Sequence, residues 1–369
     1  MKKIVAILTH WSIPNYGSFL QAYALQKFIG ETYPQYDVKQ IAYMNPVHAK
    51  MYYGYEMHEI YRLWAINPHF YQDILKRIKS IQRRKNLLKF KEFYLTSISH
   101  TEELNSRQLE KTHFDTVILG SDILWDYSIP FYNYDPYVFG NSINADKIIS
   151  YAASFGTVKP GSLHPEYVKN GIKKLDAISV RDINSAQICE ELTDAKVSNV
   201  LDPTMLWHFT DDPNIKQIDL GFNYIVVYGS FFTKDQIKFV RQFASEKNLK
   251  IICLDSFGDH CDWCDYFLPI GSISPFEWCS YIKASEYLMT CTFHGLMFGL
   301  IYNKRILFNA TSFIRDKSVD FITYLGLEEV LLNGSDFEES MSYKWDYSRI
   351  NCLINSKRKE SVDYLMKNI

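Results

Sequence analysis

Three ionisable side chains stand where apolar runs of strand length end, at positions from which a sheet presents residues to a ligand. Asp122 follows a run that ends at residue 119, Arg181 follows one that ends at 180, and His294 follows one that ends at 291. A carboxylate there can hydrogen-bond a hydroxyl group or accept its proton. A guanidinium can hold a carboxylate or phosphate at two points, and an imidazole can act as an acid. The three residues are therefore candidates for catalysis and anion binding.

Each of these residues also has a purely structural interpretation. Asp122 could be a turn or N-cap residue, which is the commoner role of Asp at such a place. Arg181 could pair with Asp182 or another acid, since arginine is rarely buried without a partner. His294 could simply be packed in the protein, although its position beside Gly295 at a strand-to-helix turn favours a functional role.

The sequence Asn15-Tyr16-Gly17-Ser18, with Gln21 shortly after it, is typical of a strand-to-helix turn. Gly17 permits a tight turn close to a ligand, and Ser18 with Gln21 has the spacing of a capping box. The N–H groups of such a helix N-terminus attract anions. We therefore predict that these five residues line a cleft, with a well-capped helix of no further function as the alternative.

Other polar residues at predicted turns complete the candidate cleft. Ser121 and Trp125 flank the carboxylate at position 122, and Thr292 is a candidate N-cap for the helix that begins near residue 293. Asp202 precedes Pro203, in a segment that most simply turns the chain at the end of a first domain.

Apolar runs of strand length alternate with segments of helical period. The predicted strands cover residues 3–9, 116–119, 147–153, 176–180, 197–201, 223–228, 249–254, 286–291 and 305–308. The predicted helices include 18–29, 183–192, 234–247, 274–284 and 293–303. This alternation predicts an α/β fold with parallel sheets. The segment 209–222 is typical of a linker, so we predict domains 1–208 and 209–369, facing a cleft at the carboxyl ends of their strands.

Composition excludes several function classes. The 369 residues carry a formal net charge of −2, which gives no electrostatic case for nucleic acid binding. The apolar run near the N-terminus, residues 4–8, is too short for a signal peptide, and no run reaches the ~18 residues that span a bilayer. Seven scattered cysteines suit a reducing compartment, so we predict a cytoplasmic protein. Cys261 and Cys264 have a metal-like spacing, but without a second Cys/His pair we interpret them as free cysteines, with a structural zinc as the alternative.

The stretch 50–95 combines many aromatic residues with a cluster of lysines and arginines, and it is predicted to be helical. A solvated helical face is the simpler interpretation. The alternative is a basic amphipathic surface that contacts anionic lipid.

Together and in this order, the motifs resemble those of the polysaccharide pyruvyl transferase family. The resemblance rests on the segments Asn15 to Ala22, Gly120 to Trp125, Ser179 to Asp182, Leu201 to Thr204, Thr292 to Gly295 and Arg315 to Leu327. It covers roughly residues 3 to 330. The resemblance implies two Rossmann-like domains in an arrangement similar to GT-B glycosyltransferases. It also implies phosphoenolpyruvate as donor and a sugar of a polysaccharide, or of its lipid-linked precursor, as acceptor, with a pyruvyl ketal as product.

The resemblance also implies roles for particular residues. Arg181 and His294, with Thr292 and Gly295 beside the histidine, match positions that bind the donor in relatives, and Asp122 is the candidate base. His294 is either the acid or a ligand of the phosphate. Some members of the family have Arg-Leu-His-Gly where this chain has Thr292-Phe-His-Gly, so part of the donor must be held from elsewhere. The scheme requires no metal and no cofactor.

Two other functions remain open at the sequence level. A nucleotide-sugar glycosyltransferase could use the same double-domain scaffold, because fold does not fix function. A non-catalytic glycan-binding protein is the other alternative. Because acceptors in this family are commonly assembled on lipid carriers, we also predict weak peripheral binding through 50–95 to the inner face of the cytoplasmic membrane.

Overall fold

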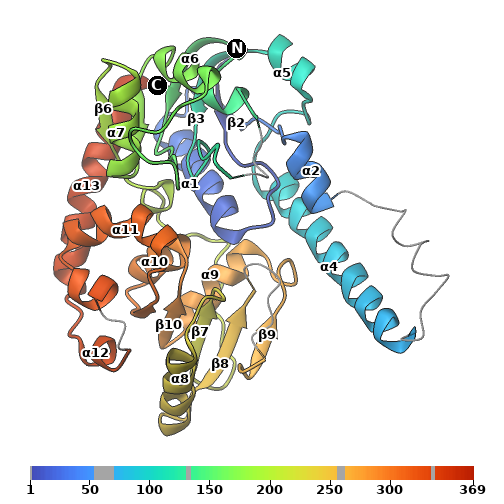
Figure 1. Cartoon of the computed structure of the whole chain (residues 1–369), viewed down its shortest axis with the longest axis vertical. Coiled ribbons are helices and arrows are strands. Elements are labelled where there is room, and N and C mark those ends of the chain that lie inside the picture. Colours follow the sequence, from blue (N-terminus) through green and yellow to red (C-terminus); the bar gives the residue numbers. More distant parts are fainter. Residues whose placement is uncertain (1, 54–69, 130–133, 256–261, 334–336) are drawn as a thin grey trace.

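The first half of the chain forms a parallel sheet. The computed structural model describes residues 2–53, 70–129, 134–255, 262–333 and 337–369. The strands β1 (Lys3–Leu8), β2 (Tyr36–Gln40), β3 (His113–Leu119) and β4 (Asn144–Ser150) lie in the order β2-β1-β3-β4. The pair β5 (Ile178–Val180) and β6 (Val197–Asn199) continues it through parallel bridges to the segment around β4. This half lies uppermost in Figure 1.

The second half forms another parallel sheet. Its strands are β7 (Tyr224–Tyr228), β8 (Lys250–Leu254), β9 (Tyr266–Leu268), β10 (Tyr287–Thr290) and β11 (Arg305–Phe308), in the order β11-β10-β7-β8-β9. The central strand reads Tyr-Ile-Val-Val-Tyr and is buried throughout. Such an unbroken apolar run is expected when helices cover both faces of a parallel sheet.

Helices follow most strands and cover the sheets. They are α1 (Tyr16–Thr32), α2 (Pro46–Tyr53), α4 (Phe70–Ser97), α5 (Ser106–Lys111), α6 (Glu166–Lys173), α7 (Ile183–Leu192), α8 (Lys234–Glu246), α9 (Pro275–Ala284), α10 (Phe293–Ile301), α11 (Ser312–Leu325), α12 (Phe337–Ser342) and α13 (Tyr347–Asn368). Shorter helical turns are η1 (Tyr137–Phe139), η2 (Pro203–Met205) and η3 (Glu329–Asn333). Side chains that cap backbone N–H groups start the helices near the cleft: Asn15 for α1, Asp182 for α7 and Thr292 for α10. None of the helices that the structure describes is both long and apolar enough to cross a bilayer.

The strand order reverses at one point in each sheet. In the first sheet β1 is flanked by β2 on one side and β3 on the other, and in the second β7 is flanked by β8 and β10. At such switch points the loops at the carboxyl ends of the strands part and leave room for ligands. The predicted motifs at 120–125 and 290–295 stand at these ends.

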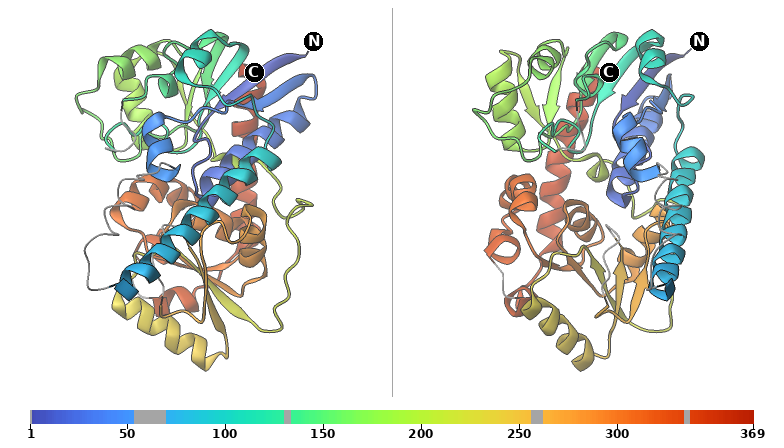
Figure 2. Two further views of the ribbon diagram at one scale, coloured as in Figure 1. Left: turned by 90° about the vertical axis from the view of Figure 1, so that its right-hand side faces the viewer. Right: turned by 45° about the vertical axis from the view of Figure 1, so that its right-hand side comes forward.

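Two helices connect the halves (Figures 1 and 2). The helix α4 runs alongside both, and its Phe90 and Tyr94 belong to one apolar cluster with Phe19 of α1 and Trp278 of α9. The helix α13 leaves the second half and ends on the first, where the Tyr364 hydroxyl donates to the Ser150 carbonyl at 2.8 Å. The last turns of the predicted domain 209–369 therefore pack on the N-terminal sheet.

Candidate active site

Arg181 lies at the centre of a buried charged cluster. Its Nη1 donates to Asp202 Oδ2 at 2.6 Å and its Nη2 to Asp122 Oδ1 at 3.0 Å. Only 2% of the Arg181 side chain is exposed. The three residues follow β5, β6 and β3, and parallel strands bring their carboxyl ends to one edge. Arg181 therefore pairs with acids, as its structural interpretation predicts, and these acids are Asp122 and Asp202. Its role in anion binding stays a prediction.

Asp122 and Asp202 are ionised anchors of this cluster. Asp122 also accepts a hydrogen bond from Ser18 Oγ at 2.9 Å. Burial alone would raise the pKa of Asp122, but the charges of Arg181 and two histidines outweigh it and hold that pKa well below its ordinary value. Burial acts in the same way on Asp202, whose pKa is nevertheless lowered, mainly by His294 and then by Arg181.

His294 reaches the cluster from the second half of the molecule. Its Nε2 lies 3.8 Å from Asp202 Oδ2, a distance for an ion pair and too long for a hydrogen bond. A methyl group on Gly17 would lie 2.2 Å from His294 Nδ1, so the N-terminus of α1 and the imidazole are in direct contact. Only a glycine permits this approach. The side chain of the neighbouring Phe293 places its ring centre 4.3 Å from the Arg181 guanidinium carbon, a cation–π contact between the two halves.

The two helices that contact each other at Gly17 and His294 are both capped at their N-termini by side chains. Asn15 Oδ1 accepts from Ser18 N at 3.0 Å, and Thr292 Oγ1 accepts from Gly295 N at 3.0 Å. A methyl group on Gly295 would lie 2.1 Å from Thr290 Oγ1, so this glycine lets α10 start close to its strand.

Other predicted cleft residues support the site from behind. Trp125 is fully buried, with Nε1 donating to the Val138 carbonyl at 2.8 Å, and it packs in the N-terminal core rather than facing the cleft. Tyr16 is also fully buried, and its hydroxyl oxygen accepts a hydrogen bond from Gly271 N at 3.2 Å, which ties the two halves together. Gln21 Nε2 donates to Thr9 Oγ1 at 3.0 Å.

Two further polar residues orient the loop that holds the carboxylates. Ser121 Oγ donates to Asp202 Oδ2 at 3.4 Å. Asp202 Oδ1 accepts from Thr204 N at 3.0 Å, so that Asp202 both caps η2, as predicted for a turn residue, and holds Arg181.

Lys317 of α11 is a candidate that sequence reasoning missed. It is 6% exposed, and its Nζ lies 3.2 Å from the ring centre of Phe313. It forms no hydrogen bond or ion pair with the residues that the structure describes. Burial, followed by the like charge of Arg181, lowers the pKa of Lys317 to about 7. The segment Arg315 to Leu327 matched the family pattern, but a lysine in a helix gives no sign by itself that it points inward.

His10, at the end of β1, was also missed. It is 6% exposed, and burial lowers its pKa, with further effects from Asp122, Arg181 and Lys317. A histidine directly after the first predicted strand was the available signal.

Two buried side-chain nitrogens of this cluster are left unpaired among the described residues. Within the described part of the chain, Arg181 Nε and His294 Nε2 have no hydrogen-bond partner. A buried donor left in this way is costly unless a ligand satisfies it. The described residues contain no group of three or more His, Cys, Asp or Glu that could hold a metal ion. Of the predicted free cysteine pair, Cys261 lies outside the described residues.

The fold defines the class of protein. Two Rossmann-like α/β halves face each other in a GT-B-like arrangement, with the charged cluster between them. A solved UDP-N-acetylglucosamine 2-epimerase shares this fold, with a TM-score of 0.50 at 10% identity over 99% of this chain and 95% of that one. The S. aureus MnaA–UDP complex gives a TM-score of 0.47 at 14% identity, covering 100% of this chain and 98% of that one. E. coli heptosyltransferase WaaC with ADP gives a TM-score of 0.38 at 9% identity, covering 85% of this chain and 90% of that one.

A family model then identifies the chain more narrowly. The model for polysaccharide pyruvyl transferase matches residues 15–308, so the chain belongs to the polysaccharide pyruvyl transferase family. It is therefore a transferase of the kind that pyruvylates polysaccharides. No curated protein sequence matches it significantly.

Proposed function

We propose that this protein transfers the pyruvyl group of phosphoenolpyruvate to a sugar of a polysaccharide or of its lipid-linked precursor, as a ketal, with release of phosphate. The observation that carries the proposal is the buried cationic cluster of Arg181, His294 and Lys317, whose donors are not all used within the protein. Phosphoenolpyruvate carries a carboxylate and a phosphate, and each needs charge-assisted donors. Lys317 supplies the cation that the Thr292-Phe293 sequence lacks.

The reaction requires one proton on carbon and two attacking hydroxyl groups, with phosphate as the leaving group. An acid protonates the methylene carbon C3, and the first sugar hydroxyl attacks C2 as it loses its proton. Phosphate then leaves, and the second hydroxyl attacks C2 to close the ketal. One of the two hydroxyl protons balances the proton given to C3, and the other leaves with phosphate. His294 and Lys317 are the acid candidates.

Asp122 has a different role from the one first expected of it. A carboxylate whose pKa is held well below its ordinary value is a weak base. Its oxygens accept from Arg181 and Ser18, so we assign Asp122 to positioning the guanidinium.

A thermal-shift measurement separates this function from its alternatives. Phosphoenolpyruvate should raise the melting temperature of the wild type, and phosphate release should follow when an acceptor is present. Stabilisation by a UDP- or GDP-sugar without any effect of phosphoenolpyruvate would favour the glycosyltransferase instead. Binding of glycans with no phosphate release would favour a non-catalytic protein.

We also propose that the enzyme works in the cytoplasm and meets lipid-linked acceptors at the inner face of the membrane through α4. Ile81, Leu88 and Leu95 of this helix are 65%, 42% and 40% exposed, and their spacing of seven residues places them on one side of it. Exposed Arg83 and Lys85 lie within the same helix. Apolar side chains flanked by basic ones suit an anionic membrane surface.

A further inference from the structure

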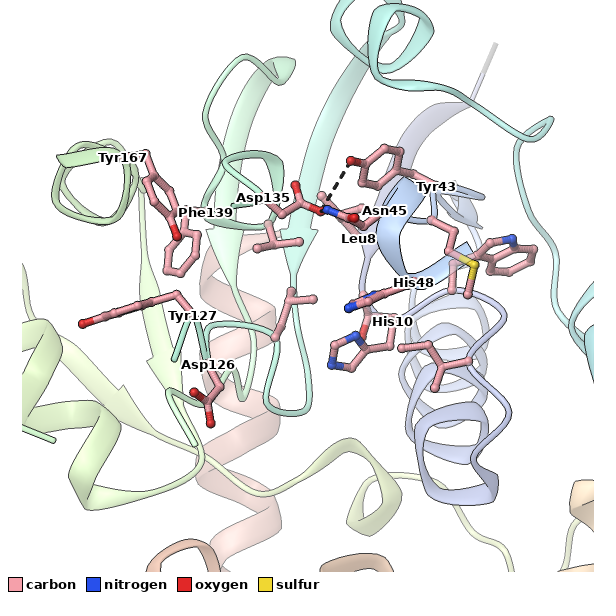
Figure 3. A pocket seen from close by; sticks show the side chains of 16 residues that line it. Leu8, His10, Tyr43, Asn45, His48, Asp126, Tyr127, Asp135, Phe139 and Tyr167 are labelled. Carbon is pink, nitrogen blue, oxygen red and sulfur yellow. Dashed lines mark hydrogen bonds between the residues drawn. The ribbon is translucent and has the colours of Figure 1, made fainter. Parts of the chain in front are cut away.

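A pocket lies in the N-terminal half, between the loops at the carboxyl ends of its strands (Figure 3). It is formed at the carboxyl ends of β1 and β3, by the loop after β2 and the start of α2, and by the loop before η1. The side chains labelled around it include His10, Asn45, His48, Tyr127 and Asp135.

One wall of the pocket carries a fixed polar pair. Asn45 Nδ2 donates to Asp135 Oδ2 at 3.0 Å, and the Tyr43 hydroxyl lies 3.4 Å from the same oxygen. Asp135 is 7% exposed, and burial raises its pKa. Its other oxygen accepts from Tyr137 N at 3.2 Å, so the side chain is held in one orientation. Amide and carboxyl groups fixed in this way can recognise hydroxyl groups, which both donate and accept.

The other wall is aromatic. Tyr127, Phe139 and Tyr167 lie across the pocket from His10 and His48 in Figure 3. Aromatic surface with a few fixed polar groups is the usual composition of a small-molecule site. It suits a sugar ring, which has apolar C–H faces and a polar rim.

The pocket differs from the proposed donor site in the charge of its lining residues. Its lining, as far as the structure describes it, contains no lysine or arginine, and two of its side chains, Asp126 and Asp135, are acids. A phosphate or carboxylate would have no charge-assisted partner there except a histidine. A neutral hydroxyl-bearing ligand needs none.

The two sites adjoin each other through Thr9 and His10. His10 lines the pocket, and its neighbour Thr9, another lining residue, donates from Oγ1 to the carbonyl of Ser121, directly before Asp122, at 3.1 Å. Asp126, a further lining residue, acts on the charge of Lys317. A ligand in the pocket would therefore lie next to an anion bound at the cluster.

We propose that this pocket binds the sugar unit that receives the pyruvyl group, with Asn45, His48 and Asp135 holding its hydroxyl groups and Tyr127 covering a ring face. The proposal rests on the proposed function, and it names the acceptor side of the same active site. The pocket without lysine or arginine suits the uncharged sugar, and the cluster of Arg181, His294 and Lys317 suits the anionic donor.

Saturation-transfer NMR on the full chain tests the pocket. The probes are methyl glycosides of the common hexoses and N-acetylhexosamines, each measured with phosphoenolpyruvate present. We expect at least one glycoside to receive saturation from the wild type. Its affinity should fall about tenfold in His48→Ala and in Asn45→Ala, since each change removes polar groups from the pocket. His208→Ala, which changes an exposed histidine outside the pocket, is the matched control and should bind as the wild type does.

Unchanged glycoside binding in both variants, or no binding of any probe to the wild type, overturns the proposal. The melting temperature of each variant checks that it is folded. If phosphoenolpyruvate stabilises the wild type but glycoside binding survives the changes, the pocket assignment fails and the donor site stands. If the changes abolish glycoside binding while phosphoenolpyruvate never binds, the pocket stands and the proposed donor fails.

Discussion

Gly17 of the first half and His294 of the second are in contact at a distance that no larger residue at position 17 allows. Gly17 belongs to α1 and His294 to α10, so their contact fixes how closely the two helix N-termini approach the charged cluster. A single hydrogen atom as side chain is thus part of the geometry of the proposed donor site.

Gly17→Ala should lower activity without unfolding the protein. The new methyl group would lie 2.2 Å from His294 Nδ1, so the imidazole or the helix must move. A displacement of this order commonly costs about 100-fold in rate. The matched control is Gly30→Ala in the same helix, where a methyl group has no neighbour within 4 Å. Phosphate release should be normal in Gly30→Ala, and a normal rate in Gly17→Ala would show that the contact is not needed.

Arg181→Lys and His294→Ala should both reduce pyruvyl transfer by roughly 30- to 1000-fold, equivalent to about 2–4 kcal/mol. An ammonium group keeps the charge of Arg181 but cannot hold two carboxylates and a ligand from one plane. Arg181→Ala should in addition destabilise the fold by about 3–5 kcal/mol, because Asp122 and Asp202 would be buried without their cation. Thermal melts and phosphate-release rates check the two effects separately, and full turnover in Arg181→Lys contradicts the assigned role.

The affinity for phosphoenolpyruvate should weaken as the pH rises from about 7 to 9. Burial lowers the pKa of Lys317 to about 7, so its amine loses its proton in this range, where the unfolded lysine keeps it. The groups acting on it are Arg181, Asp122, Asp126 and Asp182. An anion needs the protonated amine, so the dissociation constant should rise by up to about tenfold per pH unit.

Lys317→Arg should remove most of this dependence, because arginine stays protonated. Folding stability should change with pH in the opposite direction to the affinity: it should rise as the pH rises. Burial of the charged amine costs most below pH 7, and the cost falls as the pH rises toward the pKa of the unfolded lysine. Lys317→Met should therefore raise the melting temperature more at pH 6 than at pH 9. A pH-independent affinity in the wild type would contradict the assignment.

At the level of elements, sequence patterns located most of the strands and missed two strands that lie at sheet edges. The predicted strands correspond to nine strands of the structure, but β2 (Tyr36–Gln40) and β9 (Tyr266–Leu268) were not predicted. Both lie at the edge of a sheet. In β2 polar residues interrupt the apolar run, and β9 is only three residues long, so the signal is weak in each. Lys317 was missed for a related reason. Local sequence identifies a helix, but it does not show which lysine the tertiary structure buries.

The helix α4 carries a prediction of its own. Liposome flotation at low salt should show weak binding to anionic vesicles that added salt removes, because Lys and Arg each contribute about 1 kcal/mol near such a surface. Changing Arg83, Arg84 and Lys85 to Glu should abolish it, whereas the same charge reversal at Lys234, Lys238 and Arg241 of α8 should not. Equal flotation of the wild type and the α4 variant would favour the simpler interpretation, in which this stretch is a solvated helical face.

At the scale of the whole molecule, the family assignment and the fold agree on a transferase built of two α/β halves, with the charged cluster between them. The arginine and its two acids come from the first half, and the histidine and lysine come from the second. Neither half alone holds the complete cationic cluster. The order of the motifs along the chain made the family recognisable, while the contacts among them arise only from the folded arrangement.

The return of α13 to the first half has a mechanical consequence. The polypeptide crosses between the halves near residue 209 and again within α13, so it is attached at two points. Two connections allow the halves to rotate relative to each other about the axis that passes through both connections. They restrict translation of one half past the other. Substrate entry and product release would then use one rotation, which parts Gly17 from His294. Removing the last turns of α13 would leave one covalent crossing, and the relative position of the halves would then depend on side-chain packing such as that of α4 and α9.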